Sequence, residues 1–148
     1  MAKSDFSFFF DFRVRYSEVD GQLIVFNAHY LTYFDTAITE YFRNLRYDYR
    51  EQVKRTGEDF HTVKTLVEYS APIQFDDEIE VGVRTSRLGR SSLSFGLEIH
   101  PKGRDECLAS GGVIWVNVNQ TTHRAAPVSA DLVDKLRAFE GEELEVKS

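Results

Sequence analysis

The sequence predicts an α+β fold in which a curved antiparallel sheet is wrapped around one long helix. Three observations predict this fold. Apolar side chains alternate over residues 6–16, recur at helical spacing over residues 27–45, and alternate again in four later segments. Strands that cluster after a single helix are typical of an antiparallel α+β layer fold.

The first segment is predicted to be a strand with one buried face, since a helix could not place its apolar residues on one side. These residues are Phe6, Phe8, Phe10, Phe12, Val14 and Tyr16. The second segment is predicted to be an amphipathic helix of about five turns, for which Asn27 is a candidate N-cap. Its aromatic-rich stripe indicates that a sheet covers it, and consists of Tyr30, Phe34, Ala37, Ile38, Tyr41, Phe42 and Leu45.

Four further strands are predicted at residues 62–69, 78–88, 92–100 and 107–119. Turn residues at 89–91 and 101–105 favour antiparallel pairing of the strands that they join. Gly111 and Gly112 lie inside the last strand and predict a bulge or a close backbone approach. Ser129 is expected to cap a short final helix, whereas residues 46–61, with Gly57 as a breaker, fit either more helix or a loop. This order of elements already indicates the hotdog architecture.

Length and composition favour one domain, 1–148, with an acidic tail at about 140–148 that we expect to be flexible. The formal net charge of −6 makes nucleic acid and anionic membranes unfavourable partners. Cys107 is the only cysteine, which excludes an intramolecular disulfide and fits a reducing compartment. The sequence contains neither a secretory signal nor a run long enough for membrane insertion, so we expect a soluble cytoplasmic protein.

Two carboxylates, Glu18 and Asp20, lie just before the start of the predicted long helix. A helix N-terminus has unpaired N–H groups and a partial positive charge, which could polarise a carbonyl and hold an oxyanion. A carboxylate at the same place could attack that carbonyl or activate water. The alternative is that both acids only solvate a loop or cap the helix, and the local pattern alone favours this second interpretation.

Residues 16–31 resemble the motif of 4-hydroxybenzoyl-CoA thioesterase-like hotdog proteins. In that motif an acid pair is followed by an aromatic residue, Asn or His, a small residue, any residue, and then Tyr-Leu. Glu18-Val19-Asp20 matches the acid pair, and Phe26-Asn27-Ala28-His29-Tyr30-Leu31 matches the helix start. Weaker similarities follow in order at residues 68–78, 88–93 and 122–128, so that the resemblance covers most of the chain.

The resemblance implies an acyl-CoA thioesterase that releases a free acid and CoA. Asp20 would be the catalytic nucleophile or general base, and the backbone N–H of Asn27, with that of Phe26, would polarise the thioester carbonyl. Glu18 matches the first acid of the pair, which is more often structural. Arg90 and Ser91 match a turn that meets CoA phosphates, for which a guanidinium and a hydroxyl are chemically suited.

Further substrate contacts are expected from Phe26, His29, Tyr30 and Arg124, with the aromatic residues along an acyl site. The family usually has Gly where this chain has Leu23, and we expect Gly21 to supply the backbone freedom instead. CoA is expected only as part of the substrate, with no cofactor. The four histidines are scattered without metal-ligand spacing, so no metal site is expected.

The family also implies a homodimer or a higher oligomer such as a tetramer or hexamer, with active sites at the dimer interface and Arg90 acting across it. Two other functions stay open. One is a non-catalytic hotdog protein that binds acyl-CoA or acts with acyl-carrier protein. The other is a hydratase or dehydratase, which would need a histidine paired with an acid, and His29 is its candidate. Thiol release from a panel of acyl-CoAs separates these functions.

Overall fold

The computed structural model describes residues 2–147 of the chain. Its helices are α1 (His29–Asn44), α2 (Tyr49–Thr56) and α3 (Ala130–Glu140). Short 3₁₀ turns are η1 (Lys3–Asp5), η2 (Tyr16–Glu18) and η3 (Gly141–Glu143). The strands are β1 (Phe9–Arg13), β2 (Glu58–Tyr69), β3 (Glu78–Leu88), β4 (Ser92–Pro101), β5 (Ala109–Asn119) and β6 (Glu145–Val146).

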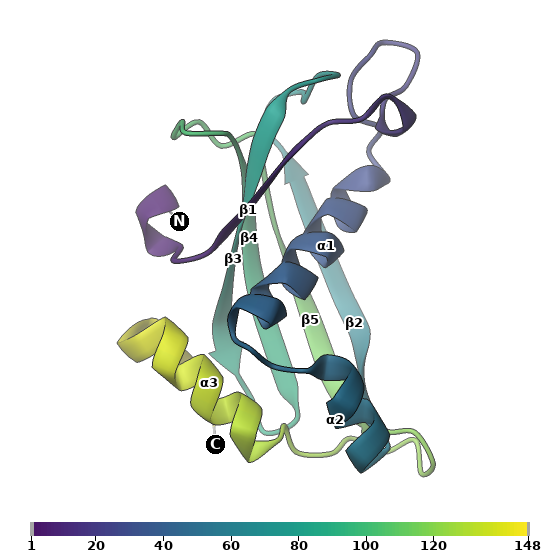
Figure 1. Cartoon of the computed structure of the whole chain (residues 1–148), viewed down its shortest axis with the longest axis vertical. Helices are drawn as coiled ribbons and strands as arrows, with labels where there is room; N and C mark the ends of the chain where they lie inside the picture. Colours follow the sequence, from purple (N-terminus) through teal and green to yellow (C-terminus); the bar gives the residue numbers. More distant parts are fainter. Residues whose placement is uncertain (1, 148) are drawn as a thin grey trace. The chain divides into compact units, whose positions relative to one another are not determined.

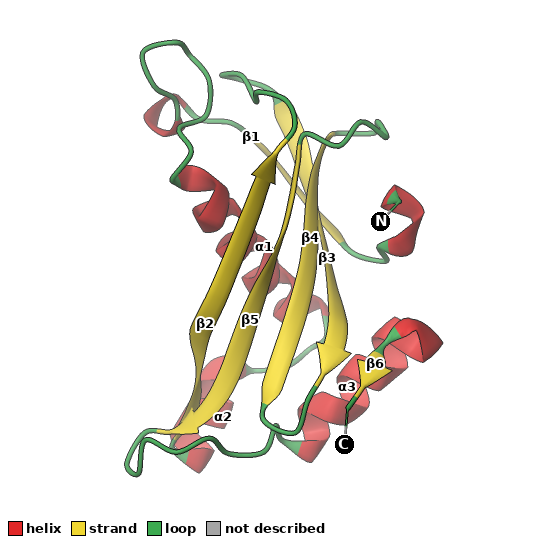
Figure 2. Ribbon diagram, turned by 180° about the vertical axis from the view of Figure 1, so that it is seen from behind, coloured by secondary structure: helices red, strands yellow, loops and turns green. Residues whose placement is uncertain are grey.

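The six strands form one sheet in the order β1-β3-β4-β5-β2, with the two-residue strand β6 pairing with β3. Strands β1 and β3 are antiparallel, with Phe10 opposite Val81, whereas β6 runs parallel to β3. Figure 1 labels the helices and strands along the chain, and Figure 2 shows the same chain from behind with the strands in yellow. The predicted α+β hotdog fold is confirmed.

Contacts divide the chain into two compact units. Unit one contains residues 1–41, 66–84 and 97–111, and unit two contains residues 42–65, 85–96 and 112–148. Strands β2 to β5 and helix α1 contribute residues to both units. The prediction of a single domain therefore stays a prediction.

In unit one, α1 packs its aromatic stripe against the sheet. The ring of Tyr33 lies 4.8 Å from that of Phe12, and the ring of Tyr41 lies 5.8 Å from that of Phe8. A Cβ atom on Gly111 would lie 2.0 Å from the carbonyl oxygen of Leu66 and 2.8 Å from the Phe34 ring. The close backbone approach predicted at this glycine is therefore confirmed, because no side chain fits between helix and strand here.

In unit two, Trp115 lies among the rings of Phe42, Phe60 and Phe95, with centroids between 5.1 and 5.6 Å apart. The segment for which the sequence fits either helix or loop forms α2. Asp48 caps its start by accepting from the Glu51 N–H at 3.1 Å. Gly57 ends α2 in the left-handed region with a φ of 69°, which a glycine adopts without strain.

Helix α3 begins at its predicted cap, where the Ser129 hydroxyl accepts from the Leu132 N–H at 3.3 Å. The acidic tail, which was expected to be flexible, has residues placed against β3. Leu144 is buried, and the Lys147 N–H donates to the Leu88 carbonyl at 2.8 Å. An apolar side chain within the acidic run explains this placement, because burying it removes apolar surface from water.

Two local predictions before α1 are wrong. Strand β1 ends at Arg13, and Tyr16 lies in η2 with 73% of its side chain exposed rather than on a buried strand face. Helix α1 begins at His29, and the Asn27 side chain makes no hydrogen bond within residues 2–147, so it is not an N-cap. The backbone turns through a compact hairpin at this point, which alternation of apolar residues does not reveal.

Candidate active site

A tight hairpin joins β1 to α1 and carries Asp20. Val19 and Val25 pair in an antiparallel bridge, and the Asp20 N–H donates to the Ile24 carbonyl at 2.9 Å. The turn is closed by the Leu23 N–H, which donates to the Asp20 carbonyl at 2.9 Å. Leu23 has a φ of 60°, so it occupies the left-handed position that Gly favours. The expectation that Gly21 supplies this freedom is wrong, because Gly21 does not have a positive φ.

The hairpin is fastened to residues 73–75, which follow β2. The Val25 N–H donates to the Ile73 carbonyl at 2.7 Å, and the Phe75 N–H donates to the Leu23 carbonyl at 2.9 Å. Ile73 is fully buried and holds this crossing in the core of unit one. The hairpin that carries Asp20 is therefore fixed against the segment that follows β2.

Glu18 anchors the beginning of the same loop and is only 6% exposed. One carboxylate oxygen accepts from the Arg15 N–H at 2.8 Å and from the Tyr33 hydroxyl at 2.9 Å. The other accepts from the Arg15 guanidinium, with Nε at 2.9 Å. Burial alone would raise the pKa of Glu18, but the hydrogen bonds from Arg15 and Tyr33 outweigh it and hold this pKa below its usual range.

Asp20 opens onto a pocket of about 470 Å³ at the start of α1. The pocket walls come from the hairpin, from the first turn of α1 and from the end of β2 with the residues after it. Its lining residues are Asp20, Ile24, Val25, Phe26, Asn27, Tyr30, Tyr69, Ser70, Ala71 and Pro72. A carboxylate, a helix start and aromatic side chains therefore share one cavity within unit one.

The Asp20 carboxylate has spare bonding capacity. Its Oδ1 accepts from the Gln22 N–H at 2.8 Å, whereas Oδ2 has no hydrogen-bond partner within residues 2–147. The same holds for the N–H groups of Asn27 and Ala28, which donate to no described protein group. The N–H of Phe26 is not available in this way, because it donates to the Glu18 carbonyl at 3.0 Å.

Of the other predicted contacts, Phe26 and Tyr30 line the pocket and Glu18 and His29 do not. The His29 ring lies 6.2 Å from the Phe26 ring, so it is a neighbour of the pocket wall. Tyr30 is only 3% exposed, and burial raises the pKa of its hydroxyl. Sequence reasoning missed Tyr69 as a lining residue, although it ends a predicted strand just before the break at 70–72.

Arg90, Ser91 and Arg124 belong to unit two and do not line this pocket. The structure does bring their two segments together. The Val128 N–H donates to the Arg90 carbonyl at 2.9 Å, and the Asn117 N–H donates to the Ser91 carbonyl at 2.7 Å. Asn119 in turn donates to the Arg124 carbonyl at 2.9 Å, so the 124–128 loop follows the end of β5 beside the 90–91 turn.

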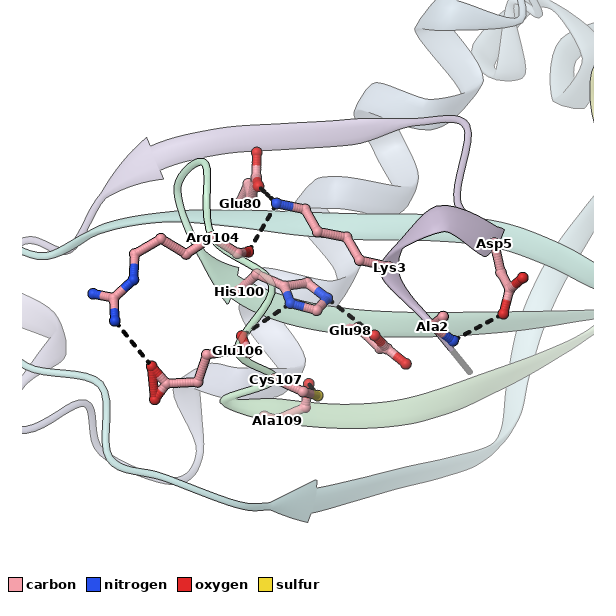
Figure 3. A network of polar contacts seen from close by, with 10 residues as sticks. All are labelled: Ala2, Lys3, Asp5, Glu80, Glu98, His100, Arg104, Glu106, Cys107 and Ala109. Atoms are coloured by element: carbon pink, nitrogen blue, oxygen red, sulfur yellow. Dashed lines mark hydrogen bonds and ion pairs between the residues drawn. The ribbon is translucent and has the colours of Figure 1, made fainter.

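A second polar cluster in unit one lies outside the pocket (Figure 3). Glu98 and His100 are almost fully buried, and their side chains meet at 3.0 Å between Oε1 and Nε2. The other ring nitrogen of His100 lies 2.9 Å from the Glu106 carbonyl. Across residues 2–147, no group of three or more Asp, Glu, His or Cys side chains is arranged to hold a metal.

Comparison with known proteins gives the family. The family model described as thioesterase superfamily matches residues 23–108, which is more than half of the chain. The chain belongs to the thioesterase superfamily. The resemblance stated from the sequence is thereby confirmed at the level of the family.

Individual relatives of this thioesterase superfamily chain support the same family and fold. The acyl-CoA thioesterase YbgC of Haemophilus influenzae is 32% identical over 92 residues, covering 62% of this chain and 67% of the relative. The PA5185 protein of Pseudomonas aeruginosa is 27% identical, with a TM-score of 0.82 over 93% of this chain and 94% of that one. A 1,4-dihydroxy-2-naphthoyl-CoA thioesterase from Synechocystis, 15% identical, shares the fold with a TM-score of 0.82 over 87% of this chain and 94% of that one.

The matched part spans between 61% and 67% of the length of the curated relatives. Among the helices of residues 2–147, none combines the length and apolar character required to traverse a bilayer.

Proposed function

We propose that this chain hydrolyses an acyl-CoA thioester to the free acid and CoA, with Asp20 as the catalytic carboxylate. The observation that carries the proposal is the shared pocket, in which the Asp20 carboxylate lines the same cavity as Asn27, whose N–H is unpaired in the described structure. Membership of the thioesterase superfamily and the name of the Haemophilus relative support the reaction class.

The reaction needs few catalytic groups, since a thioester carbonyl is already electrophilic. In one route Asp20 Oδ2 attacks the carbonyl carbon, the C–S bond breaks, and CoA leaves as a thiolate that takes a proton from water; water then hydrolyses the acyl-enzyme anhydride to the free acid and the Asp20 carboxylate. In the other, Asp20 takes a proton from a water molecule that attacks the carbonyl carbon, and the C–S bond then breaks as CoA leaves with that proton. Either route places negative charge on the carbonyl oxygen, which the Asn27 N–H at the start of α1 would stabilise.

The contacts of the CoA moiety are part of this proposal. Arg90, Ser91 and Arg124 would bind its phosphates, because the 90–91 turn and the 124–128 loop are adjacent in unit two and carry exposed guanidinium groups. CoA would be present only as part of the substrate, with no cofactor and no metal. His29 is proposed as an outer contact beside Phe26.

We also propose a homodimer or a higher oligomer. Strand β2 ends the strand order of the sheet, and it exposes 58% of Val63 and 50% of Leu66. An exposed apolar edge strand is usually covered by a partner. A cytoplasmic location remains the prediction made from the sequence.

The test is thiol release from aliphatic and aromatic acyl-CoAs by the wild type, by Asp20→Asn, and by Asp105→Asn as a matched control at an exposed position. We expect Asp20→Asn to lower kcat at least about 100-fold, because it removes the base or nucleophile, while its melting temperature stays near that of the wild type. Asp105→Asn should retain full activity. Saturable acyl-CoA binding without thiol release would reject the enzyme and favour the acyl-binding protein.

A further inference from the structure

Tyr69 makes a hydrogen bond that packing alone does not require. It ends β2, lines the pocket, and is 54% exposed, so it is not a core residue. Its ring lies 4.7 Å from the Tyr30 ring in an edge-on arrangement. Its hydroxyl donates to the backbone carbonyl of Asn27 at 3.3 Å, across 42 residues of sequence.

That carbonyl shares a peptide plane with the N–H of Ala28, one of the two unpaired donors at the start of α1. The Asn27 carbonyl also accepts from the Tyr30 N–H, at 3.3 Å. The preceding peptide is held more closely, since the Phe26 carbonyl accepts from the His29 N–H at 2.9 Å. The first peptide, which presents the Asn27 N–H, is held by the closer bond from the helix. The second, which presents the Ala28 N–H, is held by the longer helix bond and by the Tyr69 hydroxyl.

We infer that Tyr69 is a positioning residue, which holds the Asn27–Ala28 peptide so that Ala28 adds a second N–H donor beside that of Asn27. This inference rests on the proposed thioesterase function. A hydrogen bond to a peptide carbonyl fixes the plane and polarises the N–H at its other end. The pair of donors would then act on the charge that develops on the thioester oxygen, while Tyr69 itself touches no reacting atom.

The experiment compares Tyr69→Phe, which keeps the ring, with Tyr69→Leu, which removes both ring and hydroxyl. Tyr49→Phe is the matched control, because it also deletes one tyrosine hydroxyl but lies in α2 and not in the pocket lining. For Tyr69→Phe we expect kcat to fall about 5-fold, the size of one ordinary hydrogen bond, with KM unchanged within about 2-fold. Tyr69→Leu should show the same loss in kcat together with a raised KM.

If Tyr69 only stabilised the fold, its variants would show a different pattern of kcat and stability. If Tyr69→Phe keeps the wild-type kcat, or if it loses activity only in proportion to a loss of folded protein by thermal unfolding, the hydroxyl does not position the donor. The same experiments distinguish a failure of the proposed function from a failure of the role of Tyr69. A wild type that releases no thiol from any acyl-CoA rejects the enzyme, whereas an active wild type, an inactive Asp20→Asn and an unchanged Tyr69→Phe reject only the role of Tyr69.

Discussion

Two parts of unit one hold a carboxylate among other polar groups, namely the pocket around Asp20 and the buried pair of Glu98 and His100. In the pocket, Asp20 Oδ2 and the N–H group of Asn27 have no partner within residues 2–147, and the N–H of Ala28, the next residue, has none either. Glu98 and His100 are the more enzyme-like residue types, yet both ring nitrogens of the histidine are occupied.

The difference shows that residue type alone does not identify an active site. A reacting group needs a lone pair or a proton that the fold has not already used, and it needs access to solvent or a cavity. The Glu98–His100 pair lacks that access because both side chains are buried, and both ring nitrogens of His100 are already occupied (Figure 3). Asp20 has both, since it lines a cavity and keeps one free oxygen within the described residues.

Glu18 shares one feature with each part: it is buried like Glu98, and it supports the loop that carries Asp20. Its carbonyl accepts the Phe26 N–H, and its carboxylate is held by Arg15 and Tyr33. We expect Glu18→Gln to give the largest loss of stability, about 3 kcal/mol, since an amide cannot accept from all of these donors. It should also lower kcat, because the hairpin and the Asn27 donor lose their anchor.

The pH dependence of unfolding checks the cause of that loss. The pKa of Glu18 is lowered in the folded state, so its contribution is fully present above its ordinary pKa of about 4.3 and is lost as the pH falls through the folded value. Urea unfolding of the wild type and Glu18→Gln should therefore differ most at neutral pH and converge in acid. Glu18→Asp, which keeps the carboxylate on a shorter side chain, is the control. A stability gap that is the same at all pH values would contradict the assignment.

Glu98→Ala should give a smaller loss of stability and, unlike Glu18→Gln, should leave kcat unchanged. It leaves His100 Nε2 without a buried partner and opens a cavity, so we expect about 2 kcal/mol of destabilisation with kcat unchanged for the folded protein. Glu98→Gln is the matched control, because its amide N–H can donate to a neutral Nε2 and should restore most of the loss. Thermal unfolding measures the loss of stability, and thiol release measures kcat. A specific fall in kcat would show that the cluster is coupled to the pocket.

The sequence predicts the sheet and the long helix because alternation and helical spacing are local patterns, and it points to Asp20 through the resemblance of residues 16–31 to a family motif. It does not predict Tyr69 in the pocket, since that contact joins positions 42 residues apart through a side chain on another strand. Asn27 as a cap and Tyr16 on a buried face are wrong for a related reason. The backbone bonds of the 19–25 hairpin decide where β1 stops and α1 begins, and these bonds are invisible in a hydrophobic pattern.

The smallest expected effect is a gain of stability at Leu23, where the hairpin needs a left-handed residue. Leu23 has a φ of 60° and is 51% exposed, so its side chain contributes little packing to offset a backbone cost of about 1 kcal/mol. Leu23→Gly should therefore raise the free energy of unfolding by up to about 1 kcal/mol, less the entropy that glycine adds to the unfolded chain. Gly21→Ala is the comparison, because Gly21 has no positive φ and an alanine Cβ at this position would meet no atom within 4 Å. If Leu23→Gly destabilises the protein while kcat is unchanged, the leucine side chain stabilises the hairpin more than its backbone strain costs, and the turn geometry is not the limiting feature of this loop.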